Sequence, residues 1–169
     1  LAALFSSGNR EGFVREVWAG IRHVIFWTMP AITLFVVLRA QIVRVVLGSG
    51  NFSWEDTRLT AAILALFALS LISQAALLIF SRAYYAARET FVPILINVGG
   101  AITAGVLAYA GSVWLSSAEF PKMFVESMFR VSGISGTPPL MLPFSYSIVI
   151  IVASGIFAYV FGRRFGFAA

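Results

Sequence analysis

The stretch LTAAILALFALSLISQAALLIF, residues 59–80, decides the fold of this chain. It contains no charge, no Pro and no Gly, and its only strongly polar side chains are Ser70, Ser73 and Gln74. About 20 consecutive apolar residues in a helix cross the roughly 30 Å hydrocarbon core of a bilayer. The stretch therefore predicts a transmembrane α-helix.

Uncharged runs elsewhere in the chain predict further spans. A charge at the centre of a membrane helix costs about 2.5 to 3.5 kcal/mol on insertion scales, so charges should stand at helix ends. Read this way, the sequence predicts four spans, at about residues 23–47, 59–80, 91–115 and 140–161. The first reaches spanning length only if Arg39 and Arg44 snorkel or face protein, and Pro30 predicts a kink in it.

The composition agrees with a membrane protein. The 169 residues are 60% hydrophobic and only 11% charged, with a mean hydropathy of +0.92, whereas soluble domains carry about a quarter charged residues. The absence of Cys excludes a disulfide scaffold and a thiolate metal site. The net charge of +5 is dispersed between apolar runs, which argues against nucleic acid as a partner. We predict an all-α polytopic membrane bundle of about four transmembrane helices plus interfacial amphipathic helices.

The segments around the spans predict the domain organisation. Residues 1–22 are expected to form an interfacial helix or linker before a transmembrane bundle at 23–166, and 117–131 an amphipathic outer loop. Ser53 followed by Asp56 predicts a helix N-cap with a capping box. The chain begins Leu-Ala-Ala-Leu and has no leader pattern, so we expect a piece of a longer protein.

Small residues and charges predict how the spans pack and point. Gly100, Ala104 and Ala108 recur every four residues, a spacing that lets another helix approach closely.

The positive-inside rule compares the numbers of Lys and Arg residues on the two sides of the membrane. Seven lie at the termini and the 82–89 connection (Arg10, Arg15, Arg22, Arg82, Arg88, Arg163, Arg164), against five on the other side (Arg39, Arg44, Arg58, Lys122, Arg130). We therefore expect both ends to be cytoplasmic.

The pattern of titratable residues argues against catalysis. None of the seven acids lies within an apolar run, so no carboxylate is placed to relay protons or bind Na⁺ at mid-membrane. His23 is the only His and is expected to be an interfacial polar residue. The glycines of Gly48-Ser49-Gly50 and Gly99-Gly100 match no nucleotide-binding loop. We expect no enzyme activity, no cofactor and no metal.

Two polar groups leave alternatives open. Arg39 and Arg44 are candidates for binding the phosphate of an anionic substrate, since guanidinium groups bind phosphate oxygens through paired hydrogen bonds. Snorkelling toward the interface explains them as well. The segment 81–90 gathers Arg82, Tyr85 and Arg88 in a tight connection, where interfacial anchoring is the local explanation.

The segment SRAYYAARETFVP, residues 81–93, resembles the pattern S-R-x-F-Y-A-x-x-D-T-x-x-P of the MurJ (MviN) lipid II flippase family. IVRVVLGSGNF, residues 42–52, followed by Glu-Asp-Thr at 55–57, is similar to a second pattern of that family. The motif residues are Gly50, Phe52, Arg82, Tyr85, Arg88 and Pro93. Tyr84 and Glu89 depart mildly from the usual Phe and Asp, and Gln41 stands where Pro is common.

The resemblance implies that the four spans are helices nine to twelve of a fourteen-helix transporter in the bacterial cytoplasmic membrane. It implies a lipid II flippase working by alternating access, with the bilayer, a lipid-linked anionic substrate and the rest of its own chain as partners. The family's cationic cavity belongs mainly to the N-terminal half, so its substrate-binding residues are not carried over. The alternatives are a related polysaccharide or multidrug exporter and a non-transporting membrane scaffold.

Overall fold

The computed structural model describes residues 2–48, 53–117 and 140–166, except for the side chains of 2–3 and 115–117. These residues form helices and no strands. The helices are α1 (Ala2–Ser6), α2 (Arg10–Val37), α3 (Arg39–Leu47), α4 (Trp54–Ala86), α5 (Phe91–Ser117) and α7 (Met141–Phe165). The all-α bundle predicted from the sequence is confirmed, and the predicted outer loop at 117–131 lies almost entirely outside the described residues.

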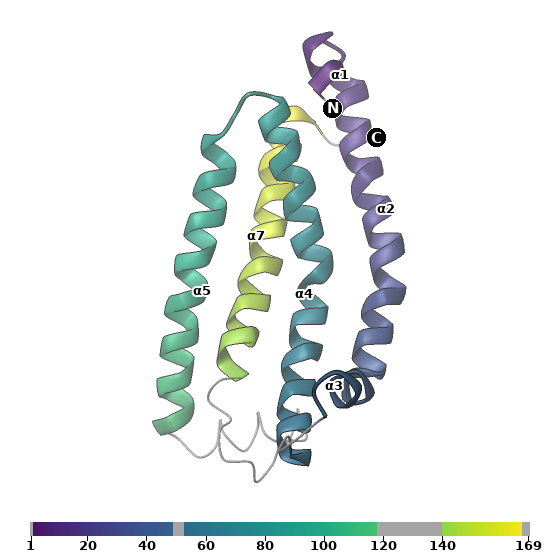
Figure 1. Ribbon diagram of the computed structural model, residues 1–169. Coiled ribbons are helices and arrows are strands. Elements are labelled where there is room, and N and C mark those ends of the chain that lie inside the picture. The colour runs from purple at the N-terminus through teal and green to yellow at the C-terminus, as the bar shows by residue number, and fades with distance from the viewer. Residues whose placement is uncertain (1, 49–52, 118–139, 167–169) are drawn as a thin grey trace.

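The four long helices lie side by side in the order α5, α7, α4, α2 (Figure 1). The last helix, α7, therefore separates α4 from α5, although those two follow each other in the chain. Both ends of the described chain and the α4–α5 connection share one end of the bundle. The short helix α3 lies across the opposite end, beside the start of α4.

Helix α2 differs in its bounds from the first predicted span. It begins at Arg10, after Asn9 accepts a hydrogen bond of 2.9 Å from the Gly12 amide, and continues past His23 without a break. The helix also runs through Pro30, and the chain leaves it only at Leu38, where α3 begins. The division of this helix into interfacial and spanning parts stays a prediction.

Helix α4 starts with the capping box that the sequence predicts. The Asp56 amide donates to Ser53 Oγ at 3.1 Å, and the Ser53 amide donates to Asp56 Oδ2 at 3.0 Å. These bonds satisfy amides that a helix start otherwise leaves unpaired. The N-cap and capping box predicted at Ser53 and Asp56 are thus confirmed.

An aromatic cluster holds α2, α4 and α7 together near the end that carries both termini. Its members are almost completely buried, at no more than 2% exposure: Phe13, Phe80, Tyr84, Phe157 and Phe161. Phe80 and Phe157 stack with centroids 5.7 Å apart. Nearer the other end, the buried Ser147 hydroxyl donates to the Leu66 carbonyl of α4 at 2.9 Å. Because lipid removes the hydrophobic drive between membrane helices, such close packing and hydrogen bonds define the bundle.

Candidate functional site

The connection between α4 and α5, together with the helix ends on either side, is here called the elbow (residues 82–93) and contains a tight hydrogen-bonded turn. The Arg88 amide donates to the Tyr85 carbonyl at 3.0 Å, and the Glu89 amide to the Tyr84 carbonyl at 2.9 Å. This pair of bonds is the Schellman motif that ends many helices. Helix α5 then starts at Phe91, with the ring of Pro93 fully buried in its first turn. Arg82, Tyr85 and Arg88 are exposed.

Arg88 has a left-handed backbone, with a φ of 61°. Schellman motifs usually place Gly at this position because a Cβ costs roughly 1 to 2 kcal/mol there. The turn therefore keeps a guanidinium group at the expense of backbone strain. Residues with backbone strain of this kind are often found at functional sites, which makes Arg88 a candidate.

A salt bridge joins the elbow to the end of α7. Arg164 Nη2 lies 2.7 Å from Glu89 Oε1, with the two side chains 49% and 30% exposed. The other carboxylate oxygen, Glu89 Oε2, and the hydroxyl of Tyr84 are buried and have no hydrogen-bond partner among the described residues. Sequence reasoning missed this contact because nothing in the pattern pairs an acid with an arginine 75 positions away.

The arginines considered for phosphate binding lie at the opposite end of the bundle, on α3. Arg44 is exposed, and its guanidinium carbon lies 5.9 Å from the ring centre of Trp54. Arg39 is half-buried. Within the described ranges, neither arginine has a carboxylate at ion-pair distance. Motif residues Gly50 and Phe52 lie outside the described residues.

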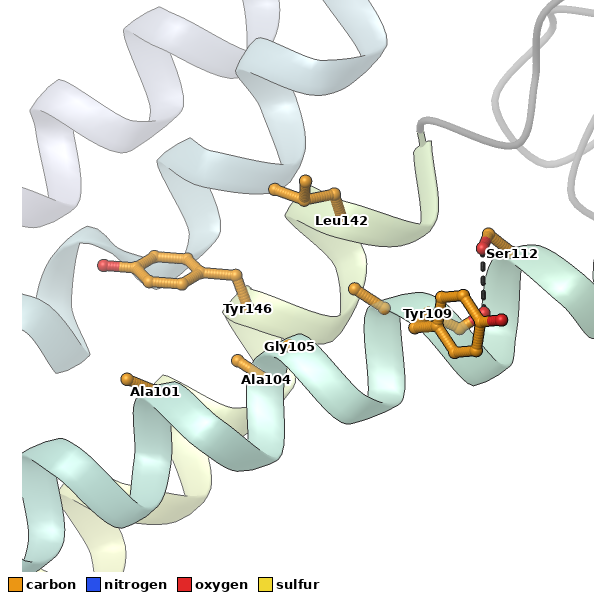
Figure 2. Close-up of a pocket in the computed structure, with 8 residues that line it drawn as sticks. Ala101, Ala104, Gly105, Tyr109, Ser112, Leu142 and Tyr146 are labelled. Carbon is orange, nitrogen blue, oxygen red and sulfur yellow. Dashed lines mark hydrogen bonds between the residues drawn. The ribbon is translucent and has the colours of Figure 1, made fainter.

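The small residues of α5 face α7. A Cβ added to Gly100 would lie 3.7 Å from Val149 Cγ1, so the two helices touch there. Ala104 and Ala108 line an open groove of about 730 Å³ between α5 and α7, with Tyr146 on its other wall (Figure 2). A second groove of about 350 Å³ follows the same contact past Gly100. Of these three small residues, Gly100 thus lies where the helices touch, and Ala104 and Ala108 line the groove.

The described residues carry little that resembles an active site. No group of three or more His, Cys, Asp or Glu side chains gathers in the part of the chain that the structure describes. The grooves are lined almost wholly by apolar side chains. The described helices instead present apolar surfaces and grooves along the bundle, and exposed arginines at both ends of it.

These features define a class of protein, a multi-pass helical membrane protein. In the part of the chain that the structure describes, four helices are long and apolar enough to cross a membrane: Arg10–Val37, Trp54–Ala86, Phe91–Trp114 and Met141–Phe165. The sequence profile of the family described as "Lipid II flippase MurJ" matches residues 1–168. The chain therefore belongs to the MurJ family of lipid II flippases.

Individual relatives agree with the family match. The chain is 27% identical to the "Probable lipid II flippase MurJ" of Thermotoga maritima, over 94% of this chain and 39% of that protein. It is 26% identical to the protein of the same description from Rhizobium meliloti, over 86% of this chain and 26% of the relative. The chain thus spans less than half the length of the relatives that it matches. No solved structure matches it significantly.

Proposed function

We propose that this chain is part of a lipid II flippase, a transporter that moves a lipid-linked peptidoglycan precursor across the bacterial cytoplasmic membrane. The observation that carries the proposal is the family match over residues 1–168, on a chain folded into four helices of spanning length. The proposed substrate is anionic and lipid-linked. Moving it requires no covalent chemistry, only alternating exposure of a binding cavity to the two sides.

The packing supports a rigid-body role in such a cycle. Transporters of this kind work largely by rocking one helical bundle against another around a central site. The aromatic cluster and the position of α7 between α4 and α5 make these helices a single packed unit. Their outer faces remain strongly apolar, with Phe26 and Trp27 of α2 and Tyr109 of α5 all at least 70% exposed. We propose that lipid and the remainder of the transporter chain cover these faces.

The charges support an orientation with both ends of this chain in the cytoplasm. The end of the bundle that carries both termini also carries the elbow, with exposed Arg82 and Arg88, and the exposed Arg163 and Arg164 of α7. Cytoplasmic connections of membrane proteins are enriched in Lys and Arg. Cysteine labelling at Arg88 from each side of sealed vesicles tests this proposal, and labelling only from the periplasmic side would contradict it.

We propose that the elbow keeps α4, α5 and α7 together as this packed unit moves. Its hydrogen-bonded turn fixes how α5 leaves α4, and the Glu89–Arg164 salt bridge ties the same turn to α7. The exposed Arg82 and Arg88 are free to contact the rest of the transporter or anionic lipid. We expect the double change of Arg82 and Arg88 to Ala in the complete protein to impair growth, while the protein still reaches the membrane.

Genetic replacement tests the proposed function. The complete gene is expressed in bacteria depleted of their own lipid II flippase, and we expect it to restore cell-wall growth. A related exporter of polysaccharides or drugs, or a non-transporting scaffold, would reach the membrane without restoring growth. Immunoblotting of membrane fractions separates that outcome from poor expression.

A further inference from the structure

Helix α3 has the position and surface of a helix lying in a membrane interface. Its nine residues follow the end of α2 and lie across the bundle rather than along it (Figure 1). Val45 and Val46 are 86% and 70% exposed. A helix that lies across the end of a membrane bundle meets the boundary between lipid head groups and acyl chains.

Arg44 and Trp54 form a cationic and aromatic pair at this boundary. The Arg44 guanidinium lies over the indole of Trp54, which is itself 60% exposed. Such stacking orients a guanidinium group and leaves its N–H donors available at the ring's edge. Trp is enriched where lipid head groups begin. The nearby Asp56 carboxylate accepts hydrogen bonds from Ser53, and no ion pair among the described residues engages Arg44.

An apolar groove lies between α3 and α4, the two helices that carry Arg44 and Trp54. It has a volume of about 280 Å³ and is lined mainly by branched and aromatic side chains, among them Ile42, Val46, Leu64 and Phe67. A free phosphate ion would gain no favourable contact from such an apolar groove. A cation on a helix that also lines an apolar groove instead fits an amphiphile with an anionic head and an acyl chain.

We propose that the α3–α4 corner binds an anionic phospholipid of the surrounding bilayer, with its phosphate on Arg44 and part of one acyl chain in the groove. The occupant is a resident lipid, because the corner combines a helix lying across the end of the bundle, an exposed Trp and a cation without an ion-pair partner among the described residues. Arg39, half-buried on the same helix, adds positive charge. The proposal goes beyond the transport function and does not depend on it.

The test compares lipid retention by the complete protein and its variants. Purified protein is mixed with phosphatidylglycerol or phosphatidylcholine, and bound lipid is counted by native mass spectrometry. Arg44→Ala should weaken phosphatidylglycerol binding about fivefold, the effect of about one interfacial charge, and should weaken phosphatidylcholine binding less, because the choline cation offsets the charge of its phosphate. Leu64→Trp, which fills the groove, should weaken both. Arg10→Ala removes an equal charge from the other end of the bundle and should change neither.

A second measurement places the lipid at the corner. Phosphatidylglycerol with brominated acyl chains should quench the fluorescence of Trp54, obtained as the difference between the wild type and Trp54→Phe. Arg44→Ala should abolish most of that quenching. Equal retention by Arg44→Ala and the wild type, or equal losses for Arg44→Ala and Arg10→Ala, would overturn the proposal. So would an effect of Arg44→Ala confined to a polyprenyl pyrophosphate, which would assign the site to the transported substrate.

Discussion

Tyr84 carries a buried oxygen whose removal should stabilise the protein. The side chain is fully buried in the aromatic cluster, and its hydroxyl has no hydrogen-bond partner among the described residues. Burying a hydroxyl without a partner costs roughly 1 to 3 kcal/mol in protein mutational data. Tyr84→Phe removes that cost and keeps the ring, whose centroid lies 5.4 Å from Phe157 and 5.6 Å from Phe165. We expect the free energy of unfolding to rise by about 1 kcal/mol.

The complete protein in detergent is the appropriate sample for this measurement, with the monodisperse fraction followed by size exclusion after heating or titration with denaturing detergent. Tyr85→Phe is the matched control, because the neighbouring side chain is 49% exposed, and surface changes usually stay within about 0.5 kcal/mol. Tyr84→Ala, which removes the ring as well, should cost about 3 to 5 kcal/mol. A loss of 1 kcal/mol or more in Tyr84→Phe would show that the hydroxyl has a partner and refute the reasoning.

Three further changes test the packing and the two helix ends. Gly100→Leu should lower thermal stability by about 1 to 3 kcal/mol, because its side chain must displace the contact with Val149. Gly99→Leu, where an added Cβ meets nothing within 4 Å, should cost less, and equal losses would contradict the close approach of α5 and α7. Arg88→Gly should raise thermal stability by about 1 kcal/mol by relieving the left-handed backbone, and a decrease would mean that the side chain holds the turn. Ser53→Ala should cost about 1 kcal/mol through loss of the capping box, read from the same melting curves, whereas an unchanged midpoint would exclude a stabilising cap.

The local features of this fold were predictable from the sequence. The long uncharged run at 59–80 predicts a helix because only a helix satisfies the backbone polar groups of a single span in lipid. The bonds between Ser53 and Asp56 follow equally directly, since both partners lie three positions apart on one helix start. The resemblance of residues 81–93 also pointed to the family that the profile match shows.

The arrangement of the helices was not predictable in the same way. Hydropathy gives the length of a span but not its neighbours, so the position of α7 between α4 and α5 leaves no local signal. The burial of Phe13 against α4 and α7 depends on that same long-range packing. Pro30 lies inside α2, which continues as a helix past it and ends at Val37, and the kink that it predicts stays a prediction.

The candidate site was likewise only partly predictable from the sequence. Arg82 and Arg88 were singled out by their local pattern, but the salt bridge between Glu89 and Arg164 required the folded chain. Similarly, Arg44 was noted as a charge in an apolar segment, whereas the groove between α3 and α4 arises only when these helices pack together. The sequence thus indicated the individual arginines, but not the salt bridge and the groove, which form only in the folded chain.

A lipid II translocation assay on the complete protein in sealed vesicles tests the central claim most directly. Labelled lipid II is placed in one leaflet, and its arrival in the other is followed with an impermeant reagent. The account predicts movement faster than in vesicles without protein, while a phospholipid lacking the peptidoglycan head group stays in place. Movement no faster than in empty vesicles, from protein that is inserted and monodisperse, would contradict it.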